Sequence, residues 1–290
     1  MMSKERKMTV IKEVTRRKFI AGAISAGAGL AIAQTASGQE EKVAVKKWRW
    51  EYMRPDDLAD AIRERPVAWV MFSPLEWHGQ AMSFGCDPFV GQTIVDRAWE
   101  NAGGVRIPTV YIGAETDYKY WGEKGLMSHW GMETQTKEHN PGSLYVRPIT
   151  LQLVVEDYLF FLEREGFKLV VLSSGHGATE HVSTLDKVCA QYEKSPMKIL
   201  RGSGHGRMPE ELRFEGAGGH ADFSEASMLG GVDPNLVDKS KFGVIERDRK
   251  VKILKENVDK IDFEKGRKVI EFRAKELEKE VNEALKNLGY

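Results

Sequence analysis

The stretch Val70–Asp87 reads VMFSPLEWHGQAMSFGCD, and it decides both the fold and the expected chemistry. An apolar run from Val67 to Leu75 predicts a buried strand that ends at Glu76 and His78. Side chains alternate along a strand, so these two groups would leave the same face, and Asp87 follows after a loop. Two carboxylates and an imidazole at a strand end indicate a divalent metal site, whereas the plainer interpretation is a solvated polar loop.

Two later segments repeat this pattern of a polar cluster at the end of a regular element. The predicted strand Phe167–Leu172 stops just before His176, which lies between two glycines that permit a tight turn. Farther along, His220 and Glu225 stand at the start of a predicted helix. Ligands of open α/β sheets gather beyond the carboxyl ends of the strands, so we expect the three segments to share one cavity.

Helical patterns alternate with the apolar strands. Residues 90–101 predict a helix between the first strand and a second one at Val105–Ile112, and this order implies parallel pairing by a right-handed crossover. The last helix, expected at Lys265–Leu288, carries apolar residues at helical spacing and a charged opposite face. The chain is therefore predicted to be an α/β protein with a mostly parallel sheet.

The composition excludes several classes of function. The 290 residues carry 43 basic and 43 acidic side chains, a balance that leaves no electrostatic footprint for binding nucleic acid. Hydrophobic residues make up 41%, which is ordinary for a globular protein and argues against bulk disorder. Two cysteines, Cys86 and Cys189, do not make a disulfide framework, and we interpret Cys86 as a packed free thiol.

The N-terminus resembles a twin-arginine export signal, on the residues Thr15–Ile20 (TRRKFI). The following run Phe19–Ala33 is rich in glycine and alanine and too short for a comfortable membrane span. We expect residues 1–38 to be the signal peptide, 39–54 a linker and 55–290 the globular domain. The twin-arginine machinery would be a partner and the domain periplasmic or extracellular, or membrane-tethered if the signal stays uncleaved as a permanent anchor.

The segment between the second strand and residue 148 has no clear period and is crowded with aromatic residues. A long loop within a domain is usually functional, and aromatic side chains commonly form the walls of a small-molecule pocket. Trp121, Trp130, His139 and Ser143 are the predicted substrate contacts. The alternatives are ordinary surface packing and a contact between subunits.

Three motifs, in the order in which they occur along the chain, resemble those of the creatininase family of metal-dependent amidohydrolases. They are Glu76-x-His78-Gly79 followed by Asp87, then Gly175-His176-Gly177, and finally His220-Ala221-x-x-x-Glu225. The turn Pro141-Gly142-Ser143 is similar to a Pro-Gly-Thr/Ser turn of that family. The resemblance covers about residues 66–234.

This resemblance implies a three-layer α/β/α fold, a centre of two divalent ions and a homo-oligomer. Glu76 and His176 would bind one ion, His78 and Glu225 the other, and Asp87 would bridge them. The ions would be Zn²⁺ or Mn²⁺, with Fe²⁺ as a further option. His220 would be the catalytic acid and base. The substrate would be a small amide or cyclic amide, cleaved at a C–N bond by a metal-activated hydroxide.

The sequence also departs from the family pattern. Ala178 stands where creatininases carry a glutamate ligand, and Gln80 and Asp222 replace other motif residues. These changes argue against creatinine itself as the substrate. They leave two alternatives open: a non-catalytic small-molecule binding protein on the same fold, or another metal-dependent reaction such as dehydration or peptide trimming.

Overall fold

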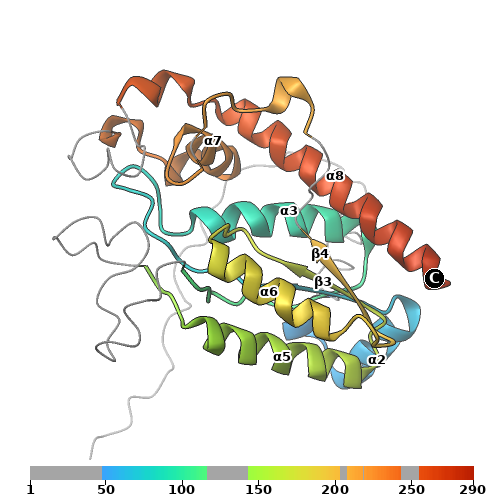
Figure 1. Cartoon of the computed structure of the whole chain (residues 1–290). Coiled ribbons are helices and arrows are strands. Elements are labelled where there is room, and N and C mark those ends of the chain that lie inside the picture. Colours follow the sequence, from blue (N-terminus) through green and yellow to red (C-terminus); the bar gives the residue numbers. More distant parts are fainter. Residues whose placement is uncertain (1–47, 116–142, 203–207, 218, 243–254) are drawn as a thin grey trace, which may run out of the picture. The chain divides into compact units, whose positions relative to one another are not determined.

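Apolar strands form the centre of the fold. The computed structural model describes residues 48–115, 143–202, 208–217, 219–242 and 255–290, and within these ranges four strands form one parallel sheet (Figure 1). The strands are β1 (Val67–Met71), β2 (Val105–Arg106), β3 (Leu169–Ser173) and β4 (Lys198–Gly202). Their order is β2-β1-β3-β4, so each parallel neighbour is reached by a crossover connection.

Helices cover both faces of the sheet (Figure 1). One face packs against α3 (Cys86–Ala102) and α8 (Phe263–Asn287), and α7 (Phe223–Val232) packs on these two helices and shares their core. The other packs against α2 (Pro55–Glu64), α5 (Pro148–Glu165) and α6 (Thr179–Gln191). The predicted three-layer α/β/α class with a parallel sheet is confirmed.

The residues of β1 show why the strand reads as one unbroken apolar run. Val67, Trp69 and Met71 belong to the core on the α3–α8 face, whereas Ala68 and Val70 belong to the core on the α5–α6 face. All five are completely buried. A parallel sheet covered on both faces has no solvated side, so polar residues do not alternate with apolar ones.

Both early strands are shorter than predicted, and proline explains each case. Beyond β1, the N–H of Ser73 still donates to the carbonyl of Val110 at 3.1 Å, so the pairing with the second strand's extension reaches this residue. Pro74 follows and has no N–H to offer a neighbouring strand. In the same way, Pro108 limits the second strand after Arg106.

Helix α3 begins four residues earlier than the predicted start at Val90. Asp87 therefore lies in the first turn of a helix and not in a loop. A carboxylate is favoured there by the positive end of the helix dipole. The consequence is that Asp87 is held rigidly at the carboxyl edge of the sheet.

Short 3₁₀ helices complete the described structure: Trp50–Tyr52, Glu210–Leu212, Pro234–Leu236, Lys239–Lys241 and Lys255–Lys260. Arg49, in the part of the predicted linker that the structure describes, contacts the domain through an ion pair with Asp96 at 2.9 Å. The predicted signal peptide, residues 1–38, lies outside the described residues. None of the helices in the described ranges is long and apolar enough to span a membrane.

Candidate metal centre

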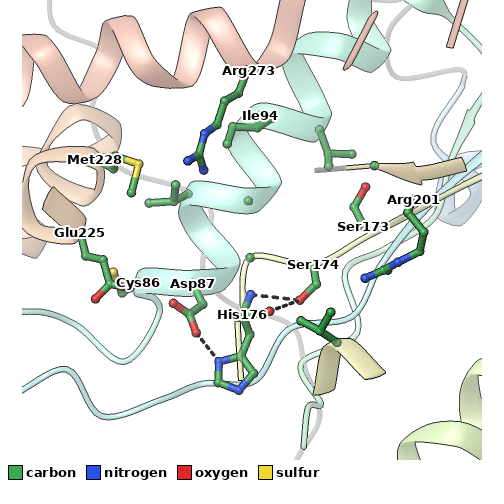
Figure 2. Close-up of a pocket in the computed structure, with 17 residues that line it drawn as sticks. Cys86, Asp87, Ile94, Ser173, Ser174, His176, Arg201, Glu225, Met228 and Arg273 are labelled. Atoms are coloured by element: carbon green, nitrogen blue, oxygen red, sulfur yellow. Dashed lines mark hydrogen bonds and ion pairs between the residues drawn. The ribbon is translucent and has the colours of Figure 1, made fainter. Parts of the chain in front are cut away.

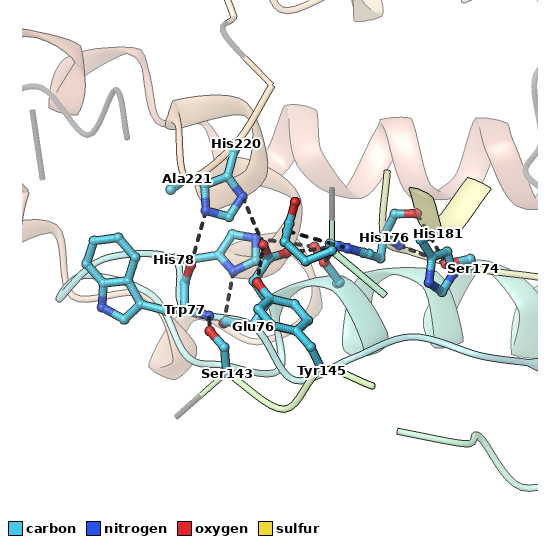
Figure 3. A network of polar contacts seen from close by, with 12 residues as sticks. Glu76, Trp77, His78, Ser143, Tyr145, Ser174, His176, His181, His220 and Ala221 are labelled. Carbon is cyan, nitrogen blue, oxygen red and sulfur yellow. Dashed lines mark hydrogen bonds and ion pairs between the residues drawn. The ribbon is translucent and has the colours of Figure 1, made fainter. Parts of the chain in front are cut away.

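The five predicted metal ligands lie together beyond the carboxyl ends of β1 and β3 (Figure 2, Figure 3). Glu76 and His78 follow β1, Asp87 opens α3, His176 lies between β3 and α6, and Glu225 lies in the first turn of α7. All except the partly exposed Glu225 are buried. A side chain on Gly175 would collide with the carbonyl oxygen of Asp87, so this glycine lets the His176 loop lie against α3.

Asp87 stands between the two histidines. Its Oδ2 is 2.9 Å from Nδ1 of His176, and its Oδ1 is 3.2 Å from Nε2 of His78. Each nitrogen faces a second carboxylate oxygen: Glu76 Oε2 lies 2.9 Å from the His176 nitrogen, and Glu225 Oε2 lies 3.5 Å from the His78 nitrogen. One N–H cannot donate well to two carboxylates, whereas a cation between them binds all three groups.

The opposite nitrogen of each ring is anchored to the backbone. Nδ1 of His78 lies 3.1 Å from the carbonyl oxygen of Glu76, and Nε2 of His176 lies 3.2 Å from that of Ala114. When these nitrogens donate to the carbonyls, the other nitrogen of each neutral ring presents a lone pair to the carboxylates. Nε2 of His78 is buried without a hydrogen bond to any described residue, as a metal-binding nitrogen would be. The residues therefore fit a pair of divalent ions.

The charges in the cluster support the same conclusion. Burial raises the pKa of Asp87 and Glu76, but the neighbouring histidines outweigh it and hold both pKa values below the usual range. Burial lowers the pKa of His78 and His176, but the surrounding negative groups raise the net pKa of both well above its usual value. The buried carboxylates thus attract positive charge strongly, which protons on the imidazoles or metal ions can supply.

His220 lies over this cluster at the start of α7 (Figure 3). Its Nδ1 is 3.7 Å from Glu76 Oε1, its Nε2 is 3.1 Å from the carbonyl oxygen of Trp77, and its ring centre is 4.5 Å from that of His78. Helix α7 begins at Phe223 with Asp222 as its N-cap, so His220 lies just before the helix. The side chain of Asp222 accepts the N–H groups of Ser224 and Glu225.

The backbone between His220 and the helix is strained. Ala221 has a φ of 52°, in the left-handed region that costs a residue with a side chain about 1–3 kcal/mol. Its N–H donates to Oε2 of Glu225. The same short turn therefore positions the proposed acid and base, His220, and the proposed ligand, Glu225.

Within the described ranges, three overlapping groups of potential ligands have donor atoms within 4.8 Å of one another. They are Glu76, His78 and His220; His78, Cys86 and Asp87; and Glu76, Glu115 and His176. Burial raises the pKa of the Cys86 thiol well above its usual value, which keeps it protonated. Cys86 is a buried free thiol, as interpreted from the sequence, and Cys189 is also free.

Of the predicted substrate contacts, Trp121, Trp130 and His139 lie outside the described residues. Ser143 lies next to the cluster, where its Oγ accepts the N–H of Trp77 at 2.9 Å. This bond fixes the segment that carries Glu76 and His78. A contact between Ser143 and a substrate stays a prediction.

Three further residues at the site were missed from the sequence. Tyr145 donates its hydroxyl to Glu76 Oε1 at 2.7 Å, and His181 contacts the His176 loop through Ser174. Glu115 is buried with its Oε2 4.0 Å from Nε2 of His176. Glu115 could have been found from the sequence, because it directly follows the apolar end of the 105–114 segment, as Glu76 follows the apolar run of the first strand.

Comparison with solved structures places this fold among known ones. A creatininase in its manganese form superposes with a TM-score of 0.63 at 19% identity, over 82% of this chain and 98% of that one. A glutamate-to-glutamine creatininase mutant in complex with creatine gives a TM-score of 0.63 at 18% identity, covering 82% of this chain and 98% of the other. The Zn-Zn type of a glutamate-to-glutamine creatininase mutant gives a TM-score of 0.61 at 18% identity, over 81% of this chain and 97% of that one.

Sequence comparison identifies the family. None of the curated proteins compared with the chain matches it. The family model described as "Creatininase: Creatinine amidohydrolase" matches residues 51–266, a range that contains all five proposed ligands and His220. The chain therefore belongs to the creatininase family.

Proposed function

We propose that the chain is a metal-dependent amidohydrolase that uses two divalent ions to hydrolyse a C–N bond in a small amide or cyclic amide. The observation that carries this proposal is the position of Asp87, whose two oxygens face the metal-binding nitrogens of His176 and His78. A carboxylate that faces two separate imidazoles is suited to bridge two ions. Membership of the creatininase family supports the same reaction class.

The ligands divide into two sets that share Asp87. Glu76 and His176 complete the first set, and His78 and Glu225 complete the second. Imidazole and carboxylate groups suit Zn²⁺, Mn²⁺ or Fe²⁺, and zinc and manganese forms are known among the superposed creatininases. Such ions, when bound, polarise a carbonyl group and lower the pKa of water.

His220 is the proposed proton carrier. It is partly exposed, with 22% of its side-chain surface accessible, so it can reach a substrate at the mouth of the cluster. Its Nδ1 faces Glu76 Oε1 at 3.7 Å, and the carbonyl of Trp77 can accept from its Nε2 at 3.1 Å. In this position His220 can hold a proton taken from water and deliver it to the leaving nitrogen.

We further propose the cellular context expected from the sequence. Residues 1–38 would direct export by the twin-arginine machinery, residues 39–54 would link the signal to the domain at 55–290, and the enzyme would act outside the cytoplasmic membrane. The motif at Thr15–Ile20 supports export. A homo-oligomeric state is proposed on the family analogy alone.

Elemental analysis of natively purified full-length protein, followed by a panel of amides and lactams, tests the proposal. We expect two ions of zinc, manganese or iron per chain and hydrolysis of at least one panel member. Glu76→Ala should lose both metal and activity, whereas His220→Ala should keep the metal and lose activity. Retained hydrolysis in both variants would reject the mechanism, and a metal-free native protein that binds amides without hydrolysing them would favour the non-catalytic alternative.

A further inference from the structure

A cavity of about 290 Å³ adjoins the proposed metal centre between α3, α7, α8 and the ends of β3 and β4 (Figure 2). Asp87, His176 and Glu225 line one part of it. Arg201 of β4 and Arg273 of α8 line another part. The same cavity therefore touches the ligands of a cation centre and two positively charged side chains.

Arg273 has no counter-charge within the described part of the chain. Its guanidinium group forms no hydrogen bond or ion pair with any described residue, although the residue is only partly exposed. Burial lowers the pKa of Arg273, yet a guanidinium group stays protonated in proteins. By contrast, Arg267 on the same helix forms an ion pair with Glu264 at 2.7 Å. A partly buried cation without a partner is costly, so a ligand that supplies negative charge would be favoured.

Ser173 adds an unused donor to the same cavity. It is 1% exposed, and its Oγ has no hydrogen-bond partner among the described residues. The neighbouring strand leaves room for this hydroxyl only because residue 202 is glycine, where a Cβ would lie 2.6 Å from Ser173 Oγ. Arg201 forms an ion pair with Asp186 at 3.0 Å, whereas the donors of Arg273 and Ser173 have no partner among the described residues.

We propose that this cavity binds a carboxylate carried by the substrate, with Arg273 as its ion-pair partner and Ser173 as a hydrogen-bond donor. The inference rests on the proposed amidohydrolase function and narrows its substrate class to small amides or lactams that bear an anionic group. A guanidinium group recognises a carboxylate through two parallel hydrogen bonds. The volume lies near the lower limit of small-ligand pockets, about 300 Å³, which favours a short substrate.

The first test measures binding without requiring turnover. Glutarate, a short dicarboxylate, is titrated calorimetrically into the full-length protein as purified, and into Arg273→Met and Arg267→Met. We expect Arg273→Met to weaken glutarate binding by about 10–100-fold, as is typical for loss of a charge-assisted hydrogen bond, while Arg267→Met changes it less than about 2-fold. Equal affinity in both variants, or no binding to the wild type, would overturn the proposal.

The second test separates the cavity from the reaction. Hydrolysis of glutaramate, which carries a carboxylate, is compared with that of pentanamide, which does not. Arg273→Met should raise KM for glutaramate by about 10-fold or more and raise KM for pentanamide by less, so that the ratio of the two KM values changes, whereas Arg267→Met should not change that ratio. If Arg273→Met binds glutarate weakly but keeps its KM for glutaramate, the anion is a separate ligand and the substrate assignment is wrong.

If neither amide is hydrolysed, the proposed function fails for these substrates, and the glutarate titration still decides whether the cavity binds an anion. Thermal unfolding of each variant checks that it is folded. Should Arg273→Met not fold, Arg273→Gln keeps a polar end group without the charge and is expected to show the same loss. Unchanged glutarate binding in folded Arg273→Gln would then overturn the proposal.

Discussion

Replacing His181 by leucine should weaken both the fold and the proposed metal centre, because His181 joins two loops that hold His176. The imidazole is fully buried, its Nδ1 accepts the N–H of Ala114 at 3.2 Å, and its Nε2 donates to Ser174 Oγ at 2.9 Å. Burial, then the charges of His176 and Arg201, hold the pKa of His181 well below its usual value. The ring is therefore neutral and fixed in one tautomer.

The magnitude follows from the two hydrogen bonds that leucine cannot make. The buried N–H of Ala114 would lose its acceptor, at a cost of about 1–3 kcal/mol, and the lost bond to Ser174 adds about 0.5–1.5 kcal/mol. The free energy of unfolding should fall by about 2–4 kcal/mol, which lowers Tm by about 4–16 °C in a domain of this size. The carbonyl of Ala114 also anchors His176, so metal affinity should fall by about 10–100-fold.

Thermal unfolding and competition for Zn²⁺ with a chelating indicator measure these two effects on full-length protein. His181→Asn is the matched control, because its amide oxygen stands where Nδ1 stood and can accept the N–H of Ala114. This variant should recover about half of the lost stability. A leucine variant with unchanged Tm and unchanged metal affinity would refute the role of His181 as a support of the His176 loop.

Two further substitutions and one metal titration test the site. Glu225→Gln should reduce the metal content from two ions to one per chain in elemental analysis after dialysis, and two retained ions would contradict its assignment. Tyr145→Phe deletes the bond to Glu76 and should lower the free energy of unfolding by about 1.5–3 kcal/mol in denaturant titrations. Burial and the nearby Glu76 raise the pKa of Tyr145 well above 10, so the tyrosine stays protonated between about pH 6 and 9. The loss of unfolding free energy in Tyr145→Phe should therefore be constant over this range, and a loss that disappears within it would contradict the role of the hydrogen bond to Glu76. Metal binding should release protons, because the raised pKa values of His78 and His176 keep both rings protonated in the metal-free protein. Metal affinity should therefore rise with pH. Calorimetry in buffers of different ionisation enthalpy measures the number of protons released, and net proton uptake would contradict the prediction.

The convergence of the site could be predicted because its ligands stand at the ends of regular elements. The apolar pattern located the strands that precede Glu76 and His176, and parallel strands end at the same edge of a sheet. The local detail was less accurate. Glu76 and His78 do not continue β1 as strand residues, since regular pairing ends before Pro74, yet the chain still brings both to the cluster.

The supporting residues could not be predicted, because their partners are remote in sequence. Tyr145 and Glu76 are 69 positions apart, and His181 and Ala114 are 67 positions apart. No periodic pattern along α6 distinguishes a buried histidine that holds a neighbouring loop from one that merely packs. The sequence therefore does not single out His181, whose hydrogen bonds to Ala114 and Ser174 show that it supports the His176 loop.

The loop that carries His176 leaves open space beside the proposed metal centre. Ala178 offers no ligand atom, and the proposed second carboxylate is that of Glu225, which the turn carrying His220 positions. A side chain on Gly177 would meet no atom within 4 Å, which leaves open space next to His176 on the side of the cavity. The open loop at Gly177 and the guanidinium group of Arg273 therefore line the same cavity, which is where the proposed anionic amide would lie.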